Sequence, residues 1–211
     1  MTVNYGVIGT GMMGCEHIRN IVQIETASVV AIADPSERSL GWGQKACQGR
    51  FTPDEYTDYR DLLARDDIDA VVVASPNFTH IDVMRDVFGT SKHVLLEKPM
   101  CTTMADSIEL RTMAEKHTGM VWIGLEYRYM SPIMSFLNEL EDNVVGDIKM
   151  FFIREHRFPF LKKVDNWNRF NRNSGGTLVE KCCHFFDMMN LVVKSKPVRI
   201  FASGAQDVNH L

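Results

Sequence analysis

The sequence lacks the features that mark membrane and nucleic-acid-binding proteins. No apolar run approaches the roughly 18 residues that a membrane-spanning helix needs, and the opening MTVNYGV lacks the basic-then-apolar layout of a signal peptide. It has no long cluster of Lys and Arg, its formal net charge is -4 and its pI is near 6.0. These properties argue against nucleic acid or an anionic membrane as the main partner. We therefore expect a cytoplasmic protein that binds a small molecule.

Cysteine is scarce and shows no ligand pattern. The five cysteines are an odd number without a C-x-x-C spacing, which is typical of reduced thiols in a reducing compartment. Cys182 and Cys183 stand beside His184, but a zinc site needs a second pair of ligands and the sequence offers none. We therefore expect no metal.

Short apolar stretches alternate with helical patterns in the first part of the chain. The composition, 45% hydrophobic and 24% charged with no low-complexity segment, is that of a globular protein. Five segments have the apolar character of buried parallel strands: 5–8, 28–33, 70–74, 93–96 and 120–125. Four segments between them have helical periodicity: 12–24, 58–64, 79–88 and 104–117. This alternation predicts a doubly wound parallel sheet, a Rossmann-type α/β domain over residues 1–123.

The pattern changes after residue 123. Helices are expected over Ser131–Leu140 and Thr177–Val193, and strands over Ile148–His156 and Val198–Ala202. A polar loop, VDNWNRFNRNSGG, lies between them. Residues 124–211 are therefore expected to form a second domain that is short of strands.

Three glycines follow the first expected strand and open the first expected helix. Gly9 permits a tight turn, Gly11 lets the backbone approach a pyrophosphate, and Gly14 lets the helix pack closely on the strand. A diphosphate then meets the positive end of the helix, which begins at Met12 and Met13. The alternative is a glycine turn that holds no ligand.

A carboxylate ends the second expected strand. Asp34 lies 20 residues beyond Gly14, at the spacing where the acidic residue of a dinucleotide fingerprint binds the ribose hydroxyls. The same negative charge repels a 2′-phosphate, so the expected cofactor is NAD, with NADP less favoured. Arg38 is the one nearby residue that favours NADP, because a guanidinium group binds phosphate well.

Two further polar stretches follow later strands, at the edge where open parallel sheets bind ligands. In ASPNFTH, Ser75, Asn77 and His80 are candidate cofactor contacts on the nicotinamide side, although these residue types are also common in turns and helix starts. In LLEKPM, Glu97 and Lys98 precede a proline that restricts the backbone, so Lys98 is a candidate functional cation. The alternative for Lys98 is a surface lysine at a strand exit.

The order of the motifs VIGTGMMG, AIAD, ASPNFTH, EKP, GLEYRYMSP and SGGTLVEKCCHFFDMM resembles the glucose-fructose oxidoreductase, inositol dehydrogenase and rhizopine-catabolism (Gfo/Idh/MocA) family over nearly the whole chain. The resemblance implies an NAD(P)-binding domain followed by an α+β domain with an open, mostly antiparallel sheet that joins a homo-oligomer. It also implies hydride transfer on sugars, inositols or related polyols. Family chains are longer, so residues 124–211 are expected to be an incomplete substrate and oligomerisation domain of a truncated chain.

The resemblance assigns Lys98, Glu180 and His184 to catalysis and to substrate binding. Oxidation of a carbinol requires a base near the hydroxyl, and His184 is the candidate. Lys98 is expected to stabilise the developing alkoxide, and Glu180 to hold a neighbouring hydroxyl. Family members commonly have Asp at the position of Glu180 and Gly at the position of Cys182.

A continuous helix over Thr177–Val193 places Glu180, His184 and Asp187 on one stripe. We expect this polar stripe to face a cleft, where the two carboxylates set the tautomer of the histidine. The opposite stripe is expected to anchor the helix, and it comprises Leu178, Cys182, Phe185 and Met189.

Residues of two loops are expected to line a sugar site. Tyr127 and Arg128 follow the last strand of the first domain, and Lys163, Trp167 and Asn168 precede the helix of His184. Each can equally serve only to pack its loop. Two other functions stay open: an NAD-dependent glycosidase without net redox change, and a non-catalytic NAD-binding protein.

Overall fold

The computed structural model describes residues 2–156, 161 and 163–205. The chain divides into two compact units, Met1–Gly124 and Leu125–Leu211, and each is described by itself. Among the described residues, no helix is long and apolar enough to cross a membrane.

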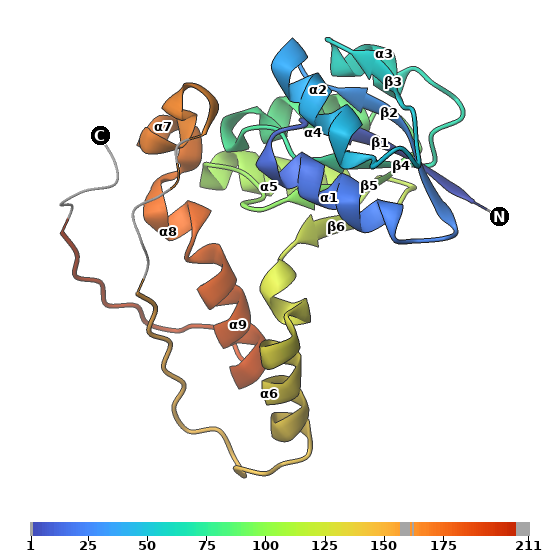
Figure 1. Ribbon diagram of the computed structural model, residues 1–211. Coiled ribbons are helices and arrows are strands. Elements are labelled where there is room, and N and C mark those ends of the chain that lie inside the picture. Colours follow the sequence, from blue (N-terminus) through green and yellow to red (C-terminus); the bar gives the residue numbers. More distant parts are fainter. Residues whose placement is uncertain (1, 157–160, 162, 206–211) are drawn as a thin grey trace. The chain divides into compact units, whose positions relative to one another are not determined.

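The first unit is built on one six-stranded, all-parallel sheet, which confirms the predicted doubly wound fold (Figure 1). Its strands lie in the order β3-β2-β1-β4-β5-β6. In chain order they are β1 (Val3–Ile8), β2 (Ala27–Ala33), β3 (Asp54–Tyr56), β4 (Ala70–Val73), β5 (His93–Glu97) and β6 (Val121–Gly124). The order reverses between β1 and β4, which is the point where doubly wound sheets bind ligands.

Five helices cover the sheet: α1 (Met12–Val22), α2 (Glu37–Ala46), α3 (Tyr59–Leu63), α4 (His80–Val87) and α5 (Met104–Ala114). A short 3-10 turn, η1 (Asn77–Thr79), precedes α4. Side-chain oxygens of Ser36, Asp58 and Thr103 accept backbone N–H groups at the starts of α2, α3 and α5, which fixes where these helices begin. Helix α2 and the edge strand β3 are absent from our sequence prediction. Two glycines interrupt the apolar spacing of α2, and β3 has three residues, two of them acidic.

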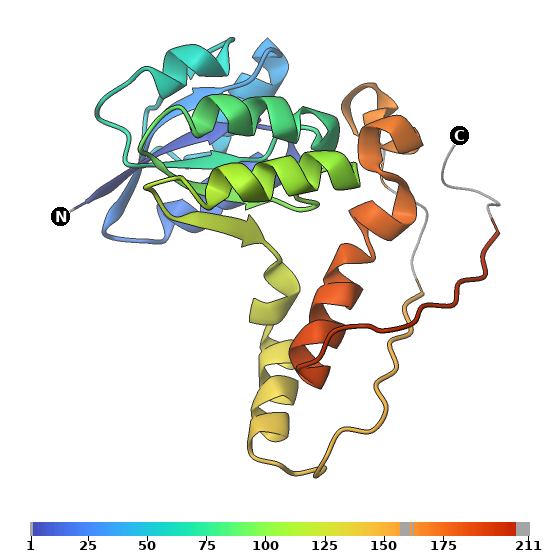
Figure 2. The same ribbon diagram turned by 180° about the vertical axis from the view of Figure 1, so that it is seen from behind.

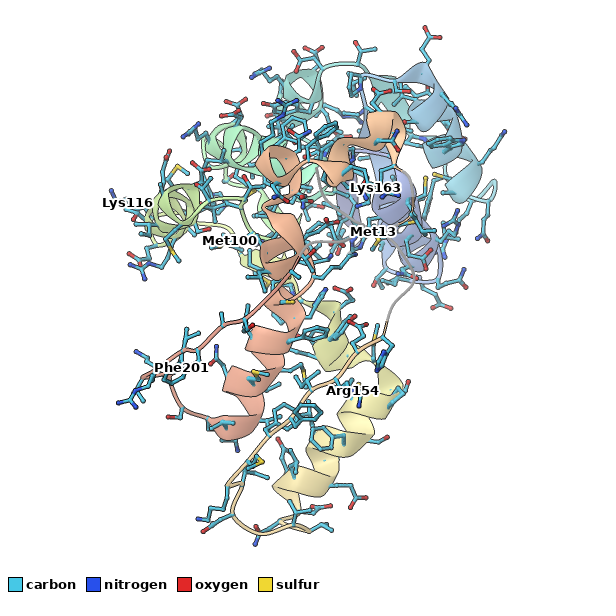
Figure 3. All side chains as sticks on the ribbon, turned by 90° about the vertical axis from the view of Figure 1, so that its left-hand side faces the viewer. Met13, Met100, Lys116, Arg154, Lys163 and Phe201 are labelled. Atoms are coloured by element: carbon cyan, nitrogen blue, oxygen red, sulfur yellow. The ribbon has the colours of Figure 1, made fainter. Side chains whose placement is uncertain are left out.

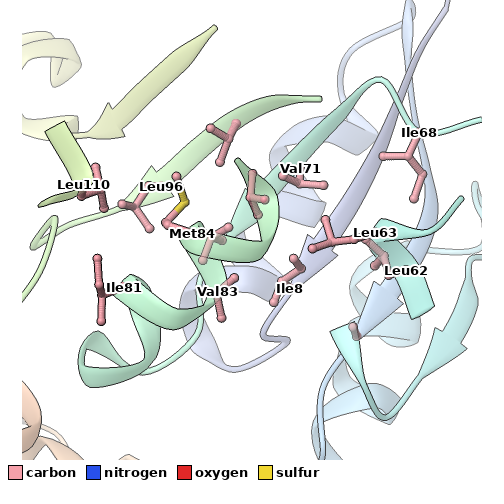
Figure 4. Packing of buried hydrophobic residues seen from close by; sticks show 14 of the residues in the cluster. Ile8, Leu62, Leu63, Ile68, Val71, Ile81, Val83, Met84, Leu96 and Leu110 are labelled. Atoms are coloured by element: carbon pink, nitrogen blue, oxygen red, sulfur yellow. The ribbon is translucent and has the colours of Figure 1, made fainter. Parts of the chain in front are cut away.

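Alternate residues of the strands pack into two apolar clusters on opposite faces of the sheet. On β4, Val72 joins α1 and α2, whereas Val71 and Val73 join α3, α4 and α5. Figure 4 shows the second of these clusters, in which Met84 of α4 and Leu110 of α5 lie beside Leu96 of β5. Helices cover both faces of the sheet (Figures 1 and 2). The polar residues that follow the strands therefore lie at the carboxyl-terminal edge of the sheet.

The regular elements of the described part of the second unit are all helical, and the described residues 146–156 and 194–205 are irregular. Its elements are η2 (Glu126–Tyr129), α6 (Ser131–Glu141), η3 (Val164–Arg169), α7 (Asn171–Ser174), α8 (Gly176–Glu180) and α9 (Cys183–Val193). Helices α6 and α9 lie side by side in both ribbon views (Figures 1 and 2).

The strands expected over Ile148–His156 and Val198–Ala202 are wrong, and the described part of the second unit has no antiparallel sheet. The two segments do not pair with each other or with any other described segment. An extended chain becomes a strand only when a neighbour takes its backbone hydrogen bonds. The apolar side chains of these segments are accordingly exposed, Met150 at 88% and Phe201 at 88%.

The single helix expected over Thr177–Val193 is also wrong, because a turn at Lys181 and Cys182 separates α8 from α9. The break changes which stripe is buried. Glu180 and His184 are 1% and 2% exposed, whereas Leu178, expected to anchor the helix, is 65% exposed. Positions on the two sides of a break no longer follow one rotation of 100° per residue. The polar and apolar stripes predicted for a continuous helix are therefore not formed.

The glycine loop yields a prediction about stability. A Cβ at Gly14 would stand 1.9 Å from the carbonyl oxygen of Gly9, whereas a Cβ at Gly41, inside α2, meets nothing within 4 Å. We expect Gly14→Ala to lower the free energy of unfolding by about 2 kcal/mol or more through overpacking. The matched Gly41→Ala is expected to raise it by up to about 1 kcal/mol, because alanine is the better helix former. Urea unfolding followed by circular dichroism measures both; equal midpoints for the two variants would contradict the packing described.

Candidate active site

The loop between β1 and α1 has the geometry of a dinucleotide cradle. Gly9 adopts φ +88°, and a Cβ there would lie 2.7 Å from the backbone of Ala74. Gly11 is the N-cap of α1 and offers no side chain to its first-turn N–H groups. A Cβ on Gly11 meets nothing within 4 Å, so the space beside it is open. The loop therefore presents the N-terminus of a helix to an uncovered space, which is the arrangement that binds a diphosphate.

Asp34 is fixed by the same loop. Its Oδ2 accepts the backbone N–H of Thr10 at 2.9 Å, and its Oδ1 accepts that of Ser36 at 2.9 Å. The carboxylate is half-buried, and each oxygen keeps lone-pair capacity for a further donor. Arg38 lies on α2 with its guanidinium 4.8 Å from the ring centroid of Trp42. Met12 and Met13 occupy the first turn of α1, the former exposed and the latter half-buried.

Two of the polar residues that follow β4, His80 and Asn77, are buried. His80 is fully buried, with Nδ1 2.9 Å from the carbonyl oxygen of Pro99 and Nε2 3.0 Å from that of Ser75. Burial lowers the pKa of His80, against the opposing effect of these carbonyls. The ring thus links the loops after β4 and β5, which favours the structural alternative for this residue. Asn77 is also buried, in η1, and Thr79 donates its hydroxyl to Ser75 Oγ at 2.8 Å.

Glu97 and Lys98 end β5, and a histidine that our sequence prediction missed lies against them. His17, on α1, has its Nε2 2.7 Å from Oε1 of Glu97. Oε2 of Glu97 accepts the backbone N–H of Lys98 at 3.1 Å. Burial raises the pKa of Glu97, but the hydrogen bond and charge of His17, with the charge and N–H of Lys98, outweigh burial and hold the pKa below its ordinary value. Lys98 is half-buried and precedes Pro99 through a cis peptide bond.

In the second unit, η2 supplies the partners of His184. Nε2 of His184 lies 3.4 Å from Oε1 of Glu126, and the Tyr127 ring stacks on the imidazole at 4.0 Å with an interplanar angle of 5°. Glu126 is absent from our sequence prediction, because nothing in the spacing of the chain connects position 126 with position 184. The carboxylates expected to flank His184 along one helix have other partners. Arg128 donates from two of its nitrogen atoms to the two carboxylate oxygens of Asp187, with Nε 2.6 Å from Oδ2.

Glu180 is a buried carboxylate with cations around it. Its Oε1 lies 3.9 Å from Nζ of Lys163 and 4.0 Å from Nζ of Lys181. Lys163, labelled in Figure 3, also lies over the ring of Trp167, 4.5 Å from the centroid. Two ammonium groups offset the cost of burying one carboxylate. Asn168 is buried and donates to the carbonyl of Leu161 at 3.1 Å, so it supports the loop.

In the described parts of both units, no three His, Cys, Asp or Glu residues are grouped so as to hold a metal ion. The five cysteines carry free thiols. Burial raises the pKa of Cys47 and of Cys101 to about 11, so these two thiols are protonated at neutral pH.

Two curated relatives are similar in sequence to this chain. An uncharacterized oxidoreductase of Bacillus subtilis, YrbE, is 28% identical over 97% of this chain and 58% of its own length. An inositol 2-dehydrogenase of Gluconacetobacter diazotrophicus is 34% identical over 71% of this chain and 44% of its own length. The chain thus spans about half the length of these relatives.

Solved structures and family profiles agree with the fold. The myo-inositol dehydrogenase of Lactobacillus casei, solved with NAD(H) and myo-inositol, superposes with a TM-score of 0.73 over 92% of this chain and 55% of that one, at 23% identity. The profile described as "Oxidoreductase family, NAD-binding Rossmann fold" matches residues 3–125, and that of the family's C-terminal alpha/beta domain matches residues 138–209. The chain belongs to the Gfo/Idh/MocA family of NAD-binding oxidoreductases.

Proposed function

We propose that the protein transfers a hydride between NAD and a CH–OH group of an inositol, a sugar or a related polyol. The observation that carries the proposal is the open space beside Gly11, at a helix N-terminus whose loop also fixes Asp34. The relative that is 34% identical is an inositol 2-dehydrogenase, which supports a polyol as the substrate class.

The residues of the glycine loop fit an NAD molecule. The first-turn N–H groups of α1, at Met12, Met13 and Gly14, would hold the diphosphate. Asp34 would take the ribose hydroxyls with the lone pairs that its two backbone donors leave unused. When bound, NAD supplies the acceptor for the hydride.

The proton chemistry belongs to side chains of the protein. His184 is the proposed base that takes the hydroxyl proton, and Glu126, 3.4 Å from Nε2, stabilises the imidazolium that results. Lys98 is the proposed cation that stabilises the alkoxide oxygen. Glu180, held among lysines, accepts a hydrogen bond from a neighbouring hydroxyl of the substrate.

The remaining residues of the second unit have supporting roles in this proposal. Lys163 and Trp167 are the proposed walls on the side of Glu180, and Tyr127 fixes the plane of the His184 ring by stacking. Arg128 is neutralised by Asp187 and holds η2 against α9. We therefore propose a scaffold role for Arg128 in place of direct substrate contact.

The activity is tested by mixing the protein with NAD and a panel of inositols and aldoses, and following the near-ultraviolet absorbance of NADH. We expect NADH to form with at least one member of the panel, in proportion to the substrate consumed. Substrate turnover without NADH would instead favour a redox-neutral reaction such as glycoside cleavage. Tight NAD binding with no turnover of any compound would contradict the proposed activity.

Substitution of Lys98 and His184 tests their roles. Lys98→Met is expected to lower the rate of hydride transfer by at least about 10²-fold and to leave NAD affinity nearly intact, because the glycine loop is untouched. His184→Asn is expected to lower the rate and to remove the limb of the pH profile that reports the base. Stopped-flow measurement of NADH formation gives both results. The exposed Lys116→Met and His156→Asn are matched controls, and wild-type rates in the Lys98 and His184 variants would refute the mechanism.

Asp34 is proposed to select NAD over NADP. A carboxylate facing a 2′-phosphate costs about 1.4 kcal/mol or more, so the protein should bind NAD at least about tenfold tighter than NADP. Asp34→Asn should narrow that ratio, because the amide keeps an acceptor but loses the charge. Calorimetric titration with each cofactor measures the ratio. Equal affinities in the wild type would refute this role for Asp34 and would indicate that Arg38 binds the 2′-phosphate.

A further inference from the structure

Glu97 is a buried carboxylate whose two oxygens hold two different parts of the first unit. Its side chain is 6% exposed, and that of its partner His17 is 21% exposed. Oε1 binds Nε2 of His17 at 2.7 Å, and Oε2 binds the backbone N–H of Lys98 at 3.1 Å. The carboxylate therefore cannot rotate without breaking a contact to α1 or to Lys98.

The His17–Glu97 pair connects elements that lie on the two sides of the point where the strand order reverses. His17 lies one turn beyond Gly14 on α1, which follows β1, whereas Glu97 ends β5, on the other side of β4. Doubly wound sheets hold their dinucleotide at the edge where this reversal occurs. The hydrogen bond thus ties the helix of the glycine loop directly to the residue before Lys98.

The mutual attraction of the two side chains does not by itself explain why a carboxylate lies here. Removing a carboxylate from water costs free energy, and a well-packed apolar pair of similar volume is often as stable or more so. An apolar pair, however, has no acceptor for the N–H of Lys98. Glu97 also lies beside β6, because it pairs with Gly124 in the parallel register of β5 and β6.

We propose that His17 is a positioning residue: through Glu97 it fixes the backbone of Lys98 relative to the helix that holds the dinucleotide. The inference rests on the proposed function, in which Lys98 stabilises the alkoxide. A small displacement of such a group lowers the rate of the chemical step without changing the contacts that bind the cofactor. His17 itself touches neither the substrate nor the cofactor in this proposal.

Three variants separate positioning from a general effect on folding. His17→Ala removes the donor to Glu97. His17→Gln keeps a donor of similar reach and is expected to restore most of what alanine loses. Arg19→Ala removes an exposed ion pair with Glu16 on the same helix and serves as the matched control.

The first measurement does not depend on activity. Hydrogen exchange of the Lys98 amide, followed by NMR, is expected to accelerate at least about tenfold in His17→Ala, because its acceptor is no longer held. The amides of β4 should keep their wild-type rates, and His17→Gln and Arg19→Ala should leave the Lys98 amide protected. Unchanged exchange of Lys98 in His17→Ala, or an equal acceleration throughout the sheet, would overturn the proposal.

The second measurement is single-turnover hydride transfer with NAD and the substrate found by the panel. His17→Ala is expected to slow transfer about tenfold with NAD affinity within about twofold of the wild type. In a Lys98→Met background the same substitution should have no further effect, because residues that act through one another are not additive. An equal loss in both backgrounds would overturn the proposal. Absence of transfer in the wild type would refute the proposed function instead, and amide exchange then decides whether His17 holds the Lys98 backbone.

Discussion

The missing Cβ of Gly14 is the constraint on which the nucleotide-binding unit depends. With only 1.9 Å between that Cβ position and the carbonyl oxygen of Gly9, no other residue lets α1 begin so close to the end of β1. The close approach leaves the space beside Gly11 open and brings the Thr10 N–H to Asp34. It also sets the direction of α1, from which His17 reaches Glu97. One packing contact thus determines where the glycine loop, Asp34 and the turn at Lys98 can lie.

Charge pairing organises the candidate residues of the second unit. Arg128 binds Asp187 and Glu126 faces His184, so the short η2 segment fixes two positions of α9 that are less than one turn apart. Tyr127, which lies between Glu126 and Arg128 in the sequence, stacks on His184. At the end of α8, Glu180 lies near two lysines, Lys181 directly after this helix and Lys163 directly before η3. The described part of this unit therefore holds two buried titratable side chains, Glu180 and His184, each beside a group of complementary charge.

The sequence predicted the elements whose signals are local and regular. Apolar runs identified five of the six strands, and the glycine spacing located the loop before α1, because burial in a parallel sheet and a tight turn each demand specific residues. The sequence did not predict contacts between residues that are far apart in the chain. Neither the contact of His17 with Glu97 nor that of Glu126 with His184 has a spacing that the periodicity of a helix or strand would indicate. The expected helix through Glu180 and His184 failed because a propensity pattern continues through the turn at Lys181 and Cys182. The expected strands near Phe152 and Ile200 failed because pairing, not alternation alone, makes a strand.

Calorimetric titration of NAD into the wild type and into Gly11→Val tests whether the space beside Gly11 holds the dinucleotide. The extended backbone at Gly11 (φ -68°, ψ -160°) is compatible with a side chain, and a Cβ there meets nothing within 4 Å, so we expect the fold to be retained. We expect one NAD to bind per wild-type chain and the affinity to be at least about tenfold weaker in the variant, because the valine occupies the place of the diphosphate. Equal affinity in the two proteins, with the unfolding midpoint unchanged, would contradict it.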